Sequence, residues 1–127
     1  MALSDTISSL GTAMINLVDN KTVYQPITTL SNGTIALENK PTIYKITPAA
    51  NTTFTFSTTS LTLANTKSYT FELCVVLSSA YSLTFPSSVK WQDGETPDLS
   101  EAGTYFLVFR TIDGGTNWLG NLQGMWN

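Results

Sequence analysis

The sequence predicts an all-β domain, folded as an antiparallel β-sandwich or jelly roll, with a short α-helix in front of it. The first observation is size: the chain has 127 residues, 42% of them hydrophobic, which suffices for one domain with its own core. The second is composition, because the chain holds 21 Thr, 13 Ser and 9 Asn, and the β-branched threonine side chain favours strands. The third is the alternation of apolar and polar residues along several short segments that turn residues separate.

The amino-acid composition argues against several kinds of function. The chain has no histidine, so it can build neither a histidine metal site nor a Ser–His–Asp triad. With six Lys and Arg residues and a net charge of −3, it offers no basic surface for nucleic acid. The single cysteine, Cys74, lies in an apolar run and is expected to be a small buried hydrophobic residue rather than a nucleophile. We expect no enzyme activity, no metal and no cofactor.

Residues 1–18 are expected to form the N-terminal helix. Its apolar side chains recur at spacings of 4, 3, 4 and 3 residues, the a/d pattern of two heptads. These side chains are Leu3, Ile7, Leu10, Met14 and Leu17. An isolated helix of about 15 residues is marginal in water, so it needs a surface to pack on. That surface is either other copies of the helix, a groove elsewhere or the helix's own domain, and we interpret the segment as an anchor or oligomerisation element.

Residues 19–41 are expected to be a connector that contains a β-hairpin. Two β-prone runs, 27–30 and 34–37, flank the sequence Ser-Asn-Gly at 31–33. Asn-Gly between such runs is a strong hairpin signal, because both residues tolerate a positive φ. The beginning of the chain lacks the features of a signal peptide, and no run of about 18 apolar residues is present. We therefore expect cytoplasmic synthesis and no insertion into a membrane.

Residues 42–127 are expected to form the β-sandwich domain. Period-two alternation identifies the strands, which are placed at 42–46, 52–57, 61–63, 68–77, 81–85, 89–91, 104–112 and 116–119. The strand at 68–77 has apolar residues on both faces over its second half, so it is expected to be central and covered on both sides there. A turn at 92–95, a loop at 96–103 and the Asp-Gly-Gly turn at 113–115 separate the last strands.

Residues 89–91, 97–109 and 113–120 resemble a module found in bacteriophage fibres and related virion proteins. The shared pattern is a Trp, a Pro-x-Leu loop, a Gly-Thr-Tyr strand and an Asp-Gly-Gly…Trp hairpin. The resemblance implies a small, commonly trimeric β-sandwich that an N-terminal segment places on a virus particle. Many fibre tips carry His-x-His pairs that bind metal along the trimer axis, and this chain has none.

These observations lead to a functional hypothesis with one alternative. The chain is expected to be a structural component of a bacteriophage virion, an oligomeric short fibre displayed on the head or the tail. Its expected partners are copies of itself, with a trimer favoured by the resemblance, and other virion proteins of the capsid, portal-tail or baseplate. The alternative is a carbohydrate-binding or receptor-binding module that contacts glycans on the host surface.

Aromatic residues are the candidate contacts for either role. Trp91, Trp118 and Trp126, together with three tyrosines at 24, 44 and 81, could form a platform for a sugar face. Core packing or subunit contact is the favoured interpretation, because large aromatics dominate both. Trp126, next to the end of the sequence, is expected to pack on a neighbouring strand or on another subunit.

Carboxylates gather in the loop that follows Trp91. They are Asp93, Glu95, Asp98 and Glu101. Paired carboxylates can hydrolyse glycosides or bind calcium, but no partner residues or EF-hand spacing accompany these four. The favoured interpretation is a solvated loop.

Overall fold

The computed structural model describes residues 24–127. The predicted N-terminal helix, with Leu3, Ile7, Leu10, Met14 and Leu17, therefore lies outside the described residues. The described part is built from strands and one short 3₁₀ turn, which confirms the all-β prediction. In chain order the elements are β1 (Ile27–Leu30), β2 (Thr34–Ala36), β3 (Ile43–Ile46), β4 (Thr52–Thr53), β5 (Thr55–Ser57), β6 (Tyr69–Leu77), β7 (Leu83–Thr84), β8 (Val89–Trp91), η1 (Gln92–Gly94), β9 (Gly103–Thr111) and β10 (Trp118–Trp126).

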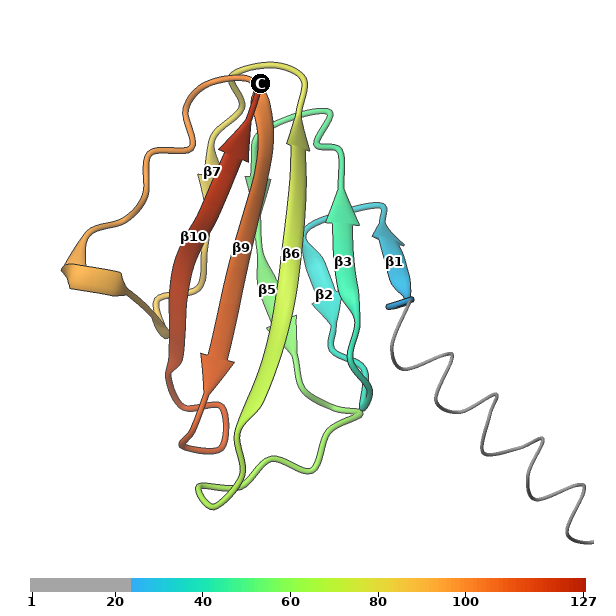
Figure 1. The fold of residues 1–127 in the computed structure, drawn as a ribbon, viewed down its shortest axis with the longest axis vertical. Coiled ribbons are helices and arrows are strands. Elements are labelled where there is room, and N and C mark those ends of the chain that lie inside the picture. Colours follow the sequence, from blue (N-terminus) through green and yellow to red (C-terminus); the bar gives the residue numbers. More distant parts are fainter. Residues whose placement is uncertain (1–23) are drawn as a thin grey trace, which may run out of the picture.

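A six-stranded sheet in the order β1-β3-β6-β9-β10-β8 forms the larger layer (Figure 1). Strands β6, β9 and β10 pair antiparallel, whereas β1 with β3, β3 with β6, and β8 with β10 pair parallel. The sheet is therefore mixed, and the expectation of a purely antiparallel arrangement was wrong. The reason lies in the connections: between β1 and β3, and again between β3 and β6, the chain crosses to the second layer before it returns.

The second layer consists of two short parallel pairs, β2 with β5 and β4 with β7. In Figure 1 these strands lie behind the large sheet. Their apolar side chains reach its inner face: Phe56 of β5 meets Phe71 and Phe109 edge-on, with ring centroids 5.0 and 5.2 Å apart. Phe54, between β4 and β5, is 1% exposed and stacks on Phe85 at 4.8 Å. The core therefore lies between the two layers.

The hairpin expected around Asn32-Gly33 is not formed. Strand β1 pairs with β3 in the large sheet, whereas β2 pairs with β5 in the second layer, so the Asn-Gly loop carries the chain from one layer to the other. Gly33 is buried, and a Cβ at this position would collide with the carbonyl oxygen of Thr53. Its carbonyl oxygen accepts a hydrogen bond from the Thr55 N–H at 2.9 Å. Glycine at position 33 thus permits two backbone segments to approach closely. Residues 27–36 belong to the same two layers as residues 43–126.

The alternation predicted for the long strands is confirmed. Strand β6 lies centrally between β3 and β9, and its inner-face residues Phe71, Leu73, Val75 and Leu77 are all buried. On β9 the inner-face side chains Tyr105, Leu107 and Phe109 are at most 1% exposed. Period-two patterns of this strength identify which side chains enter the core.

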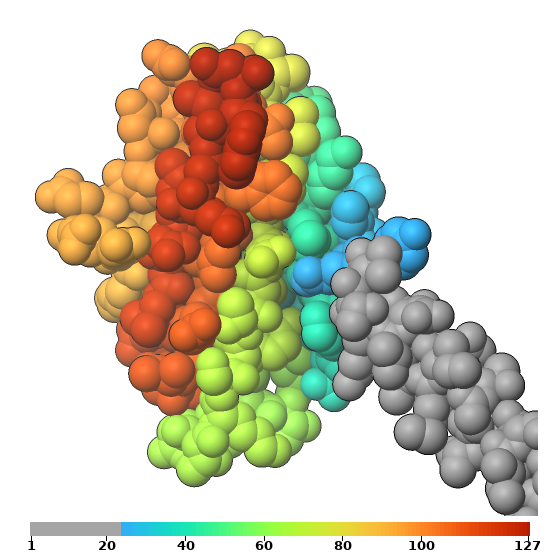
Figure 2. All heavy atoms as spheres, in the orientation of Figure 1, coloured from blue at the N-terminus to red at the C-terminus, as the bar shows by residue number. Residues whose placement is uncertain are grey.

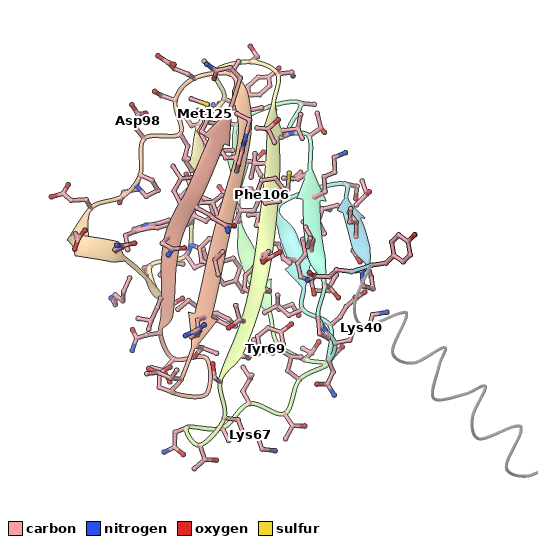
Figure 3. All side chains as sticks on the ribbon, viewed as in Figure 1. Lys40, Lys67, Tyr69, Asp98, Phe106 and Met125 are labelled. Carbon is pink, nitrogen blue, oxygen red and sulfur yellow. The ribbon has the colours of Figure 1, made fainter. Side chains whose placement is uncertain are left out.

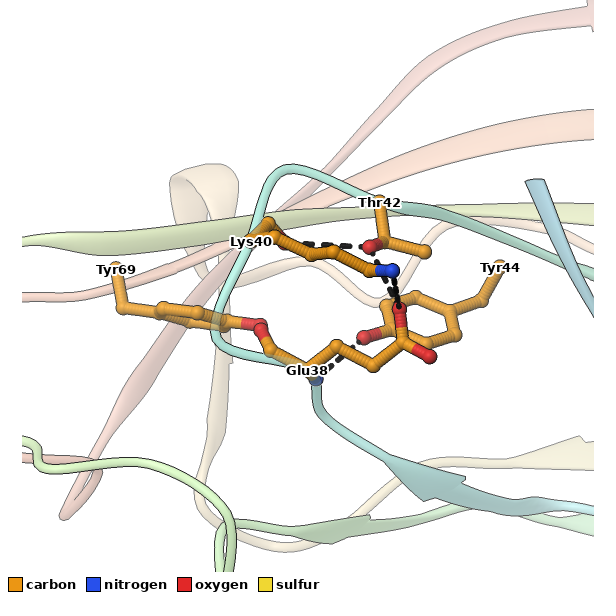
Figure 4. Close-up of polar contacts among 5 residues, drawn as sticks. All are labelled: Glu38, Lys40, Thr42, Tyr44 and Tyr69. Carbon is orange, nitrogen blue, oxygen red and sulfur yellow. Dashed lines mark hydrogen bonds and ion pairs between the residues drawn. The ribbon is translucent and has the colours of Figure 1, made fainter. Parts of the chain in front are cut away.

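A polar cluster around Glu38 holds the loop between β2 and β3 (Figure 4). The hydroxyl of Tyr69 donates to the Glu38 carbonyl oxygen at 2.7 Å, and the Glu38 N–H donates to the hydroxyl oxygen of Tyr44 at 2.7 Å. Thr42 donates through Oγ1 to Glu38 Oε2 at 2.9 Å. Burial, followed by the neighbouring Tyr44 and Glu38, raises the pKa of Tyr69, so its hydroxyl remains a donor. These bonds satisfy backbone groups that have no strand partner.

The turn between β9 and β10 is organised by Asp113. Its carboxylate accepts hydrogen bonds from the backbone N–H of Asn117 at 3.0 Å, from the amide of the same residue at 2.9 Å and from Thr111 Oγ1 at 3.0 Å. These donors, the Asn117 N–H first, lower the pKa of Asp113. Gly114 and Gly115 have φ values of 73° and 89°, which confirms the positive-φ turn predicted there.

Candidate functional site

One face of the six-stranded sheet is not covered by the second layer, and we call it the outer face. Within residues 24–127, β6 is therefore covered on one side, and not on both sides as the sequence had suggested. Figure 2 looks onto it. The strand register places its side chains in lateral rows. One row is Ile27, Ile43, Glu72, Val108 and Asn121, and a second is Thr29, Lys45, Cys74, Phe106 and Gly124. A third is Thr70, Arg110, Leu119 and Lys90, and a fourth is Val76, Thr104 and Trp126.

Four large exposed apolar side chains lie on the outer face. Ile27 is 61% exposed, Leu119 47% and Trp126 55%. Ile112 directly follows β9, continues its outward alternation and is 56% exposed. Of the six large hydrophobic side chains that are exposed among residues 24–127, these four belong to the outer face. These side chains are exposed on the side of the sheet that the second layer does not cover, so a partner that packs on this side would bury them.

Trp126 reaches the outer face because of a β-bulge. Leu122 pairs with Leu107 of β9, and Gly124 pairs with the next residue, Phe106, so β10 advances by two residues where β9 advances by one. The irregularity changes the face on which the end of β10 presents its side chains. The Trp126 ring then stands edge-on to Phe106 at a centroid distance of 5.5 Å. Figure 3 shows Phe106 near the middle of this face.

Gly124 makes room for that arrangement. A Cβ at position 124 would lie 2.8 Å from the Trp126 ring. From the sequence, Trp126 was expected to pack on a neighbouring strand or on another subunit. In the structure it contacts a neighbouring strand and still leaves more than half of its side chain exposed. The bulge itself was missed, because nothing in the alternation of the sequence indicates an extra residue at 123.

The other two tryptophans have different positions. Trp118 is 2% exposed and packs edge-on against Phe71 at 5.4 Å and Phe56 at 5.5 Å, so it is a core residue out of reach of a ligand. Trp91 is half-buried on edge strand β8 and packs against Phe109 at 5.7 Å. Opposite Trp91 lies Gly120, where a Cβ would come within 3.1 Å of both rings.

The six aromatic residues considered as a sugar platform do not form one. Tyr44 is 0% exposed and Trp118 is in the core, whereas Tyr24 is 78% exposed and lies just before edge strand β1. Tyr81 follows β6 at the start of the segment that leads to β7. The structure therefore separates these rings among the core, the loops and opposite edges of the sheet.

A shallow hollow of about 540 Å³ lies on the outer face where β8, β9 and β10 meet. Its lining includes two cations, Lys90 and Arg110, and two amides, Gln92 and Asn121, beside Leu119. Trp91 also lines the hollow. Arg110 is held in place across the sheet, since its Nε donates to Thr70 Oγ1 at 3.2 Å. Cationic and amide donors next to apolar surface suit an anionic or polar partner.

Charge is distributed unevenly between the outer face and the loop that follows β8. The outer face carries three cations, Lys45, Lys90 and Arg110, and one carboxylate, Glu72. Residues 92–101 carry four exposed carboxylates and no cation. The ion pair found among residues 24–127, between Lys40 and Glu38 at 4.0 Å, involves neither group. Both groups of charges therefore remain available to a partner.

The acidic loop lacks the features of a glycosidase or metal site. Asp98 accepts hydrogen bonds from the hydroxyl and the N–H of Ser100, and these bonds lower the pKa of Asp98. A glycosidase general acid needs the opposite shift. Within residues 24–127, no three His, Cys, Asp or Glu side chains are grouped so that they could hold a metal ion.

Cys74 lies in the middle of the outer face and is 6% exposed. Burial raises the pKa of its thiol, against a smaller opposing effect of Lys45. A raised pKa reduces the thiolate fraction, so this thiol is a weak nucleophile.

Comparisons with protein-family models, with curated proteins and with solved structures found no match. Among residues 24–127 there is no helix that could cross a membrane.

Proposed function

We propose that this chain is a structural subunit of a bacteriophage virion, which assembles with copies of itself into a short fibre on the head or the tail. The observation that carries the proposal is the outer face, where four large apolar side chains are exposed on one side of a single sheet. A surface of this kind is stabilised when another protein covers it. The setting on a phage particle rests on the resemblance of residues 89–120 to virion modules.

The low proportion of charged residues in the chain supports a role in assembly with other protein subunits. Only 12% of its residues are charged, and interface cores are depleted of charge because desolvating an ion is costly. The proposed arrangement is a two-layer sandwich with an N-terminal helix at residues 1–18, and three copies form one fibre. The helix anchors the fibre to a capsid, portal-tail or baseplate protein, and the role is structural rather than enzymatic.

Particle incorporation tests this proposal. Phage that carry the chain without residues 1–18 should assemble particles that lack it, because the anchor is gone. Phage in which Leu3 is replaced by Ile, a volume-conserving change in the same segment, should keep the protein on the particle. Normal incorporation of the shortened chain would contradict the anchoring role of this segment.

The hollow supports a second candidate function, binding of a carbohydrate on the host surface. Arg110, Lys90 and Asn121 place hydrogen-bond donors around an apolar floor, which suits a saccharide that carries a carboxylate. We expect Asn121→Ala to abolish binding of such a saccharide while the melting temperature stays unchanged. The matched exposed amide Asn39, in the loop between β2 and β3 and outside the hollow, supplies the control variant Asn39→Ala. Equal binding by all variants would contradict a sugar site in the hollow.

A further inference from the structure

We infer that the outer face is the contact between copies of this chain, and that it receives the acidic loop of residues 92–101 from the neighbouring copy. The inference rests on the proposed self-assembly and deepens it, because it names the two surfaces that meet. It describes a head-to-tail contact, in which each copy uses its outer face toward one neighbour and its loop toward the other.

We assign another copy of this chain as the partner of the outer face because the segment proposed to assemble, residues 1–18, precedes the outer-face strand β1 in the sequence. Residues 1–23 precede Tyr24, and the strand that follows, β1, forms an edge of the large sheet with Ile27 on the outer face. The proposed self-assembly takes the heptad pattern at 3–17 as a contact of this preceding segment with other copies of itself, one of the three surfaces open to it. Six residues, 18–23, lie between Leu17 and Tyr24 in the sequence, so the reach between these two residues is at most about 25 Å. If the segments at 3–17 of several copies associate, a linker of this length keeps neighbouring copies at a high effective concentration next to the outer face.

The distribution of charge indicates which surface of the neighbouring copy contacts the outer face. Two outer faces packed against each other would place three cations against three cations, with only Glu72 on each side to offset them. Like charges across an interface are costly. The loop at 92–101 presents Asp93, Glu95, Asp98 and Glu101, all exposed, and therefore has the opposite sign from the outer face.

The shapes of the loop and of the hollow also fit a contact between them. The loop with η1 projects from the β8 side of the molecule, at the left of Figure 1, away from the layers. The hollow between β8, β9 and β10 lies on the outer face, where Lys90 and Arg110 flank Leu119. A projecting acidic loop can enter this hollow while Leu119 is covered. Repeating the contact around an axis closes a ring.

Charge reversal in the full chain tests the contact. The variants are Arg110→Glu, Glu95→Lys and the double variant with both changes, and Lys67→Glu is the control. Lys67 is an exposed cation in the loop before β6, away from the outer face (Figure 3). All these side chains are exposed, so folding should persist, and circular dichroism checks it. The readout is the concentration at which the oligomer dissociates, followed by light scattering during dilution.

We expect each single reversal to raise the dissociation concentration by about 10-fold or more, because it places like charges in contact. The double variant should return to within about 3-fold of the unmodified chain, because opposite charges again face each other across the contact. Lys67→Glu should behave like the unmodified chain. A monomeric unmodified chain would overturn both the self-assembly and this contact. An oligomer that ignores the single reversals, or a double variant no better than the singles, would overturn the contact alone.

Discussion

The indole of Trp126 stands edge-on to the ring of Phe106, with the ring centroids 5.5 Å apart and the planes at 86°. Both residues belong to the outer face, and the β-bulge between Leu122 and Gly124 turns Trp126 toward that face. The bulge thereby adds a large half-exposed ring to a surface that already presents Leu119 and Ile27. The position of Trp126 therefore follows from one β-bulge. The bulge leaves this tryptophan on the exposed outer face, whereas Trp118 is buried.

Trp118→Ala and Trp126→Ala should differ strongly in stability. Trp118 is 2% exposed among core aromatics, so truncation should lower the free energy of unfolding by about 3–5 kcal/mol. Trp126 is 55% exposed, so its loss should cost about 1 kcal/mol, the order of one aromatic pair. Urea denaturation of both variants measures these values. Equal losses would show that Trp126 is packed as a core residue.

Tyr69→Phe should destabilise the loop between β2 and β3. The change removes the donor that satisfies the Glu38 carbonyl oxygen at 2.7 Å, and a part-buried acceptor left unpaired costs about 1–2 kcal/mol. Tyr24→Phe is the control, because the Tyr24 side chain is 78% exposed and water replaces any bond it makes. A loss of stability in the control as large as in Tyr69→Phe would rule out the hydrogen bond as its source.

Acid should weaken the fold through Asp113. Hydrogen bonds from Asn117 lower the pKa of Asp113 in the folded chain, so the ionised form binds its neighbours better than the protonated form. The stabilisation is present above the unfolded-state pKa, near 3.8, and is lost as the pH falls through the lower folded-state pKa. Asp113→Asn should show a shallower loss of stability in this acid range, measured by urea denaturation at several pH values. A variant curve parallel to the original would exclude Asp113 as a source of the pH dependence.

Two glycines should tolerate a methyl group to different degrees. At position 33 the group would collide with the backbone carbonyl of Thr53, whereas at position 120 it would press on the rings of Phe109 and Trp91 at 3.0–3.1 Å. Side chains can shift more easily than a strand backbone, so Gly120→Ala should cost about 1–3 kcal/mol and Gly33→Ala more. Thermal unfolding ranks the two variants, and the reverse order would contradict the close approach described at Gly33.

The sequence shows which face of a strand a side chain occupies more clearly than it shows which strands pair with each other. Alternation along 69–77 and 103–111 predicts correctly which side chains enter the core, because side-chain direction in a strand depends on local geometry. Pairing depends on contacts between residues far apart in the chain. The run at 27–30 therefore joined β3 instead of its neighbour at 34–36, despite a favourable Asn-Gly turn.

The candidate surface was predictable only in part. Trp126 was expected to contact a strand or a subunit, but the remaining apolar residues of the outer face, Ile27, Ile112 and Leu119, were not identified. Their exposure depends on which face the second layer covers, and a two-sided apolar strand does not reveal this. The acidic loop was recognised from the sequence, whereas the cations of the outer face came together only through the register of five strands.

The most direct test of self-assembly is the mass of the full chain in solution, measured by light scattering at several concentrations. A stable species of three times 13.8 kDa is the expected result, with dissociation on dilution that the outer-face variants shift. A mass of 13.8 kDa at every concentration would contradict the account, because the apolar outer face would then remain exposed in a monomer.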